Sequence, residues 1–209
     1  MDYELMMNGN VKIGQKAPDF EAVTTYGDIK LEDYKGKWIV LFSHPGDFTP
    51  VCTTEIIAFA KTNTYFEELN TKLLGLSVDS NPSHLAWMND IYLKTGIIVP
   101  FPIIADLGGV VARKYGMISN DVSNTKTVRN VFIIDDKGII RLILIYPMNV
   151  RKMYTRDIKN FKSTSNSRQN RNVNTSKLGR RAAFNSKFTT NFFRITKKTK
   201  RDRGKQKWI

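Results

Sequence analysis

The chain has 209 residues, of which 41% are hydrophobic, enough for one domain-sized core. Its formal net charge of +14 is uneven, since residues 1–150 carry 14 Lys and Arg against 17 Asp and Glu, whereas residues 151–209 carry 19 against 2. We expect no membrane span, because no run approaches about 18 apolar residues, and no signal peptide. We therefore expect a soluble protein. A single cysteine cannot form an internal disulfide, so nothing indicates an oxidising compartment, and we expect a cytoplasmic location.

Apolar runs alternate with helical patterns along the chain. Strand–helix–strand order predicts right-handed parallel crossovers. Two apolar runs that are separated by a turn with Gly138 predict a hairpin. The expected strands are residues 38–43, 73–78, 101–105, 128–134 and 139–145, and the expected helices are residues 49–69, a segment opened by Pro82 and residues 108–115. Together they predict an α/β fold with a mixed central sheet flanked by helices.

The only cysteine stands where a buried strand turns into a helix. The segment runs His44-Pro45-Gly46-Asp47-Phe48-Thr49-Pro50-Val51-Cys52-Thr53-Thr54-Glu55. Cys52 falls in the first helical turn, where free N–H groups and the helix dipole favour the thiolate, which is the reactive form. Thr49 lies three residues earlier, so its hydroxyl can face the sulfur.

This segment resembles the active-site signature of peroxiredoxins, and the preceding Ser-His resembles the one-cysteine-type subfamily that is also common in archaea and anaerobes. The resemblance covers about residues 10–150 and includes, in order, Ala17-Pro18-Asp19-Phe20, Leu76-Ser77-Val78-Asp79, Pro102-Ile103-Ile104-Ala105-Asp106 and Thr127-Val128-Arg129-Asn130-Val131-Phe132. It implies a thioredoxin-like fold.

The resemblance also implies roles for individual residues. Cys52 would be the nucleophile that attacks hydrogen peroxide or an organic hydroperoxide and becomes a sulfenic acid. Thr49 would position the peroxide, Pro45 would shield the pocket, and Arg129 would favour the thiolate and stabilise negative charge on the leaving oxygen. Glu55 would support the arginine.

The same residues have plainer interpretations. A lone cysteine is usually a small buried hydrophobe, and Arg129 alone would be a charge at a sheet edge. His44 is either a base or, as we favour, a pocket-lining residue; His84 is structural, and Glu55 can simply complement a helix N-terminus. With two histidines and one cysteine we expect no metal site and no cofactor.

The expected partners are the peroxide and an external thiol reductant, either thioredoxin-like or small. The resemblance implies a homodimer or decamer, although residues 151–209 show none of the family's C-terminal domain. A competing hypothesis is nucleic-acid binding by the basic tail, but the tail has no recognisable module and the body no basic face. A disulfide oxidoreductase would need Cys-x-x-Cys, and position 55 is Glu.

Residues 151–209 have no sustained period, and we expect them to be a disordered tail. Family members continue with Glu-Ile-Leu-Arg-x-Leu-Lys-Ala-Leu-Gln and then Thr-Pro-Ala-Asn-Trp. Permitted codons for residues 156–168 and 174–178 encode both motifs one base later, in a common frame and in this order. The tail is therefore interpreted as a frame-shifted remnant of the dimerisation domain.

Overall fold

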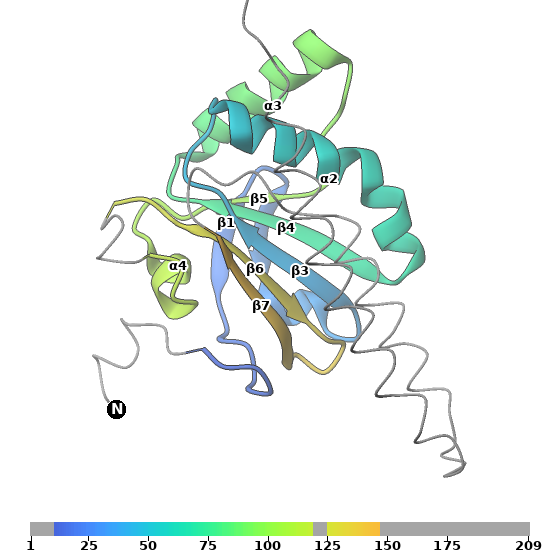
Figure 1. Cartoon of the computed structure of the whole chain (residues 1–209), viewed down its shortest axis with the longest axis vertical. Helices are drawn as coiled ribbons and strands as arrows, with labels where there is room; N and C mark the ends of the chain where they lie inside the picture. The colour runs from blue at the N-terminus through green and yellow to red at the C-terminus, as the bar shows by residue number, and fades with distance from the viewer. Residues whose placement is uncertain (1–10, 119–124, 147–209) are drawn as a thin grey trace, which may run out of the picture. The chain divides into compact units, whose positions relative to one another are not determined.

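The computed structural model describes residues 11–118 and 125–146, and Figure 1 shows their arrangement. The described residues form one seven-stranded sheet in the order β2-β1-β5-β4-β3-β6-β7. The strands are β1 (Glu21–Thr24), β2 (Gly27–Lys30), β3 (Trp38–Ser43), β4 (Thr71–Ser77), β5 (Ile103–Ala105), β6 (Arg129–Ile134) and β7 (Ile140–Tyr146). The helical elements are η1 (Leu31–Tyr34), α2 (Pro50–Glu68), α3 (Asn81–Thr95) and α4 (Val110–Lys114).

The centre of the sheet is parallel, and its borders are antiparallel. Strand β3 pairs with β4 in parallel, β4 pairs with β5 in parallel, and β3 pairs with β6 in the antiparallel sense. Every residue of β3 and β6 is buried, as expected for strands covered on both faces. The ends of β3 and β6 thus bring the segment after Ser43 and the start of β6 to one place.

Helices cover both faces of this sheet. Strand side chains alternate, so Val40 and Phe42 join the core under α2 and α3, whereas Ile39 and Leu41 join the core that holds α4 and η1. Helix α2 contributes Ile56, Phe59 and Phe66 to the first core, and α3 contributes Trp87 and Ile91. This packing fixes α2 and α3 against the strands that precede them.

The predicted mixed α/β fold is confirmed, and the expected strands and helices agree with the structure to within two residues at most ends. The strand expected from residue 101 begins at Ile103 instead, because Pro102 has no N–H to give to a sheet ladder. The hairpin between β6 and β7 turns at Gly138, whose φ is 77°, as predicted. The β1–β2 hairpin and η1 were not predicted from the sequence.

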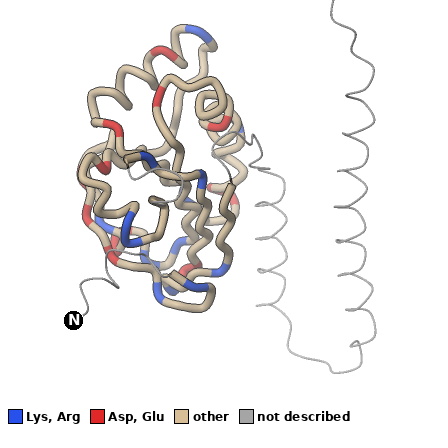
Figure 2. Tube along the Cα trace, turned by 60° about the vertical axis from the view of Figure 1, so that its left-hand side comes forward, with Lys and Arg blue, Asp and Glu red and all other residues tan. Residues whose placement is uncertain are grey.

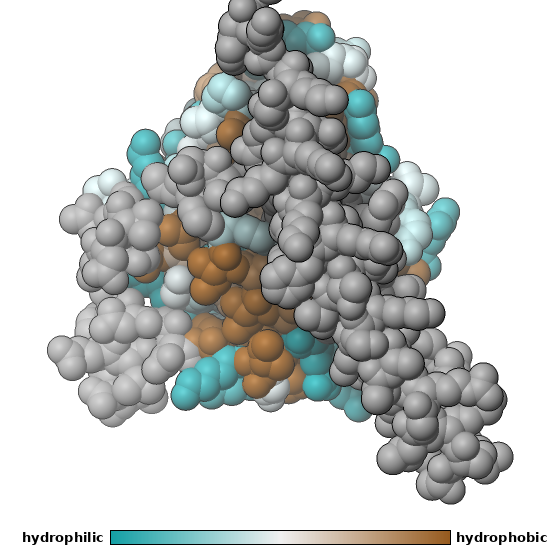
Figure 3. All heavy atoms as spheres, viewed as in Figure 1, coloured by the Kyte–Doolittle hydropathy of each residue, from teal (hydrophilic) through white to brown (hydrophobic). Residues whose placement is uncertain are grey.

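The surface of the described part does not share the strong positive charge of the whole chain, which is +14. In Figure 2, Lys and Arg lie among Asp and Glu over the described part, and no face of one sign is seen in this view. Figure 3 shows hydrophobic side chains over β7, where Ile145 is 66% exposed. No helix among the described residues is long and apolar enough to cross a membrane. The expected domain limits at residues 10 and 150, and the tail 151–209, lie outside the described residues.

Candidate active site

Cys52 is the third residue of α2. Thr49 is the N-cap, with extended φ and ψ of −82° and 143°, and Pro50 opens the first turn, where its missing N–H costs nothing. The N–H of Thr53 donates to the carbonyl of Thr49 at 2.9 Å and closes this turn. Cys52 is fully buried, whereas Thr49 and Phe48 are exposed, so the turn leads from the surface into the core.

Arg129 reaches Cys52 from the neighbouring strand. It is the first residue of β6 and is 4% exposed. Its Nη2 donates to Cys52 Sγ at 3.4 Å, and its Nη1 forms an ion pair with Glu55 Oε2. The antiparallel β3–β6 ladder places the start of β6 beside the end of β3, and Glu55 lies one helical turn after Cys52. The structure thus brings Cys52, Arg129 and Glu55 together.

This arrangement has a definite electrostatic character. A guanidinium presents several donors in one plane, so Arg129 can contact the sulfur and the carboxylate at once. The contact with the sulfur is buried and the ion pair with Glu55 is partly buried, and Coulomb interactions are stronger there than in water. The positive charge of Arg129 is compensated by Glu55 and can stabilise negative charge that develops at the sulfur or at an oxygen beside it.

The structure places Thr49 and Pro45 around this centre without a direct bond to the sulfur. Thr49 Oγ1 donates to the carbonyl of Gly46 at 3.0 Å, and no hydrogen bond joins Thr49 to Cys52 in the part of the chain that the structure describes. Because its proton is engaged, the Thr49 oxygen is left as an acceptor. Pro45 is buried in the loop between β3 and α2.

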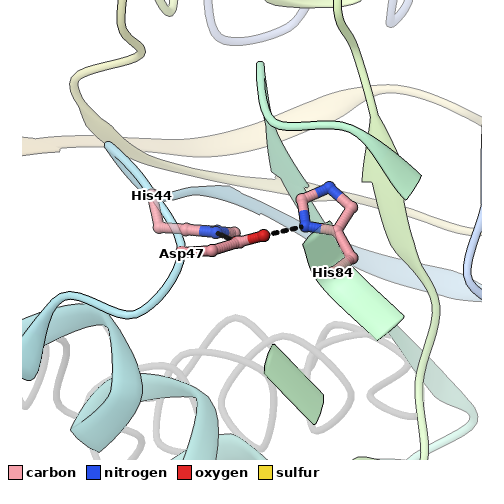
Figure 4. Close-up of side chains that lie close together, drawn as sticks. All are labelled: His44, Asp47 and His84. Atoms are coloured by element: carbon pink, nitrogen blue, oxygen red, sulfur yellow. Dashed lines mark hydrogen bonds and ion pairs between the residues drawn. The ribbon is translucent and has the colours of Figure 1, made fainter. Parts of the chain in front are cut away.

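His44 belongs to a buried cluster that the sequence analysis missed. Its Nε2 lies 2.9 Å from Asp47 Oδ1, and the other carboxylate oxygen of Asp47 lies 2.8 Å from His84 Nδ1 on α3 (Figure 4). The His44 ring also packs on Trp87, with centroids 5.0 Å apart. His84 thus contacts the loop that precedes Cys52, and its expected structural role stays a prediction.

The expectation that no set of metal ligands can be assembled rested on histidine and cysteine alone. Asp47 adds a carboxylate, and the ligand atoms of His44, Asp47 and His84 all lie within 4.8 Å of one another. Both histidines hydrogen-bond to the carboxylate of Asp47, and the other nitrogen of His84 faces the carbonyl of Ile104 at 3.2 Å. We therefore interpret the cluster as a hydrogen-bond network.

Burial and hydrogen bonding act in opposite directions within the cluster. Burial lowers the pKa of His44, and its hydrogen bond to Asp47 only partly offsets this. For Asp47, burial raises the pKa, but hydrogen bonds from His44 and His84 outweigh burial, so the pKa lies below its ordinary range. At neutral pH Asp47 is thus a carboxylate, and His44 is a neutral ring.

We predict that His44 makes the folded protein less stable in weak acid. Because folding lowers the pKa of His44 below its ordinary 6.5, the unfolded chain binds this proton more readily, and stability falls as the pH drops below that value. Asp47, His84 and Asp79 are the charged groups that face this ring. His44→Gln should therefore flatten the change in unfolding free energy between about pH 8 and about pH 5. Urea unfolding at several pH values measures it, and equal slopes for both proteins would refute it.

The comparisons with known proteins agree with this geometry. The sequence matches the AhpC/TSA family over residues 13–143. It is 63% identical over 139 residues to Peroxiredoxin 2 of Caldanaerobacter subterraneus subsp. tengcongensis, covering 66% of this chain and 63% of the relative. It is 60% identical over 139 residues to Peroxiredoxin 2 of Sulfurisphaera tokodaii, covering 66% and 65%. The chain thus spans just under two thirds of the length of these relatives.

Solved structures of the same kind share the fold. A yeast mitochondrial 1-Cys peroxiredoxin has a TM-score of 0.70 and 43% identity, covering 76% of this chain and 78% of that chain. A cysteine-to-serine mutant of peroxiredoxin 6 of Arenicola marina has a TM-score of 0.72 and 33% identity, covering 81% and 80%. These similarities confirm the expected thioredoxin-like architecture. The chain belongs to the AhpC/TSA family, together with these peroxiredoxins.

Proposed function

We propose that the protein is a thiol-dependent peroxidase in which Cys52 reduces hydrogen peroxide or an organic hydroperoxide. The observation that carries this proposal is the buried contact of Arg129 with Cys52 Sγ at 3.4 Å, in the first turn of α2. A charged donor at this place can stabilise negative charge that develops on the sulfur and on the departing oxygen. Membership of a family that includes peroxiredoxins supports the same chemistry.

The reaction proceeds in two balanced steps. The thiolate of Cys52 attacks one oxygen of the peroxide, the O–O bond breaks, and an S–O bond forms, giving the sulfenic acid. The other oxygen leaves as hydroxide or alkoxide and takes a proton from solvent to become water or an alcohol. Two external thiols then return the sulfur to the thiol, and they yield one disulfide and one water. The chemistry requires no cofactor.

The neighbouring residues have supporting roles in this proposal. Arg129 contacts the sulfur and the departing oxygen, and Glu55 holds the guanidinium. Thr49, whose proton is held by Gly46, accepts a hydrogen bond from the hydroperoxide O–H. Pro45 and His44 are buried in the loop after β3 and line the site.

The proposed partners follow from the single cysteine. With no second thiol in this sequence, the reductant is an external thiol, thioredoxin-like or small. The similar yeast protein is described as a 1-Cys peroxiredoxin whose thiol is resolved through glutathione and thioredoxin systems, which supports this assignment. We also propose a cytoplasmic location and, if the family's C-terminal domain is present in the intact gene product, a homodimer or decamer.

An assay of thiol-dependent peroxide removal tests the function. The purified protein should consume hydrogen peroxide only when a thiol is present, and alkylation of Cys52 should stop the reaction. Nucleic-acid binding by the basic tail is the competing activity, and a salt titration with duplex DNA measures it. Peroxide removal that survives alkylation, or that is absent in protein with a free thiol, would refute the proposed function.

Removal of the Thr49 hydroxyl is expected to impair the reaction. Thr49→Val keeps the shape of the side chain but loses the acceptor, so the rate constant for peroxide should fall by about 100-fold, whereas Thr49→Ser should retain most of it. Thr62→Val is the matched control, because its hydroxyl donates to the carbonyl of Ala58 farther along the same helix. Stopped-flow kinetics give the rate constants, and equal rates for Thr49→Val and the control would exclude a role for Thr49.

We also propose that residues 151–209 are a frame-shifted remnant of the family's C-terminal domain. The basic composition of this part, the two motifs recovered one base later and a family match that ends at residue 143 support the proposal. Resequencing of the gene tests it. An intact frame through position 151, with codons that do not encode both motifs one base later, would overturn it.

A further inference from the structure

A continuous chain of hydrogen-bonded side chains runs from α3 to the loop before α2. His84, near the start of α3, is hydrogen-bonded to one carboxylate oxygen of Asp47, and His44 is hydrogen-bonded to the other (Figure 4). The side chains of all three residues are at most 2% exposed. The network is therefore shielded from water, so these three side chains hydrogen-bond to one another and not to solvent.

Both ring nitrogens of His84 face oxygen atoms. Its Nδ1 faces the Asp47 carboxylate at 2.8 Å, and its Nε2 faces the carbonyl of Ile104 at 3.2 Å. Both partners are acceptors. The hydroxyl of Ser83 donates to the same carboxylate oxygen at 2.8 Å, so His84 and Ser83 both hold this side of the Asp47 carboxylate.

The backbone around Asp47 is anchored as well. The N–H of Asp47 donates to Asp79 Oδ2 at 3.0 Å, and the hydroxyl of Ser77 donates to that same oxygen at 2.8 Å. The next residue, Phe48, has a φ of 58°, a backbone angle that residues other than glycine rarely adopt. Asp47 therefore holds the loop in a strained conformation immediately before Thr49.

Asp47 also decides which nitrogen of His44 carries the proton. A carboxylate only accepts, so His44 Nε2 must be the N–H, and the neutral ring then keeps its lone pair on Nδ1. That Nδ1 is buried and has no hydrogen-bond partner among the described residues. The hydroxyl of Thr127 donates to the carbonyl of His44 at 2.6 Å, and Trp87 packs on its ring, so the residue is fixed from several sides.

We propose that Asp47 and His84 are positioning residues of the reaction: the hydrogen bond between them holds the Asp47 carboxylate against His44, which keeps His44 as the Nε2–H tautomer with Nδ1 as a buried acceptor. The inference rests on the proposed peroxidase function and adds two residues to it. The link to the nucleophile is Trp87, which packs on His44 and donates from Nε1 to Thr53, the residue after Cys52.

Nitrogen-15 NMR of the histidine rings tests the proposal directly on the wild-type protein. The expected spectrum at neutral pH shows His44 protonated at Nε2 and bare at Nδ1. In Asp47→Ala the tautomer should no longer be fixed, and the rate constant for peroxide should fall by about 10-fold to 100-fold. Asp47→Asn should restore both, because its carbonyl still accepts from His44 and its amide keeps a hydrogen-bonding group beside His84.

Two further variants separate positioning from general loss of structure. Asp135→Ala is the control, since Asp135 is a buried carboxylate that binds Arg141 and the β6–β7 turn; it should lower stability and leave the tautomer of His44 unchanged. In a His44→Gln background, Asp47→Ala should cost little further activity, because it acts through His44.

The proposal is overturned if wild-type His44 carries its proton on Nδ1 or on both nitrogens at neutral pH. It is also overturned if Asp47→Ala costs the same activity with and without His44. These results differ from failure of the function, which would appear as wild-type protein that consumes no peroxide.

Discussion

Replacement of Cys52 by serine is expected to abolish peroxide turnover. The sulfur is the proposed nucleophile, and a serine hydroxyl beside Arg129 cannot take its place, because it is a far weaker nucleophile at neutral pH. No second cysteine exists in this sequence to compensate. The rate of thiol-dependent peroxide consumption should therefore drop to that of buffer with thiol alone.

The substitution exchanges one sulfur atom for oxygen, so the fold is expected to persist. Urea unfolding of Cys52→Ser should show a transition close to that of the wild type, which makes the kinetic result interpretable. Retention of peroxide turnover by folded Cys52→Ser would show that another group carries the reaction.

The second large effect is expected for Arg129→Ala. The substitution removes the donor 3.4 Å from Cys52 Sγ and the charge that stabilises the departing oxygen. Loss of one such donor costs about 100-fold to 1000-fold in rate, and we expect a loss of this size in the step with peroxide. Arg129→Lys should recover only part of it, because an ammonium cannot contact Glu55 and the sulfur in the planar fork geometry.

Arg141→Ala is the matched control for this experiment. Arg141 lies on β7, pairs with Asp135 and is 45% exposed in its side chain, so its removal should leave the peroxide step unchanged. Stopped-flow measurement of the peroxide step, separate from the reduction by thiol, gives both rates. Equal rates for the two variants would place Arg129 outside the reaction.

The core of the fold could be predicted from the sequence because its signals are local. Strand β3 is a continuous apolar run, and α2 opens at a proline next to a residue in extended conformation. The β1–β2 hairpin was missed because its strands have four residues each and are mostly exposed. Its cross-strand pair of Glu21 and Lys30, with Nζ and Oε1 2.7 Å apart, becomes visible only once the register is known.

The site divides in the same way between local and distant residues. Cys52 and Thr49 lie within one helical turn, and the sequence alone indicates their proximity. Arg129 is 77 residues away from Cys52. It was identified through the family resemblance, because the local sequence pattern does not reveal which strands pair. The meeting of Asp47 with His84 depends on how α3 packs. One signal was available: His84 shares the helical period of Trp87 and Ile91, which are buried.

Mass spectrometry of Cys52 after one equivalent of hydrogen peroxide tests the central claim most directly. The account predicts that the peptide with Cys52 gains one oxygen atom, that a sulfenic-acid probe captures it, and that an external thiol reverses it. With a single cysteine in the chain, no disulfide should dominate when thiols are absent. Peroxide consumption with Cys52 unmodified, or a Cys52–Cys52 disulfide between two chains as the main product, would contradict it.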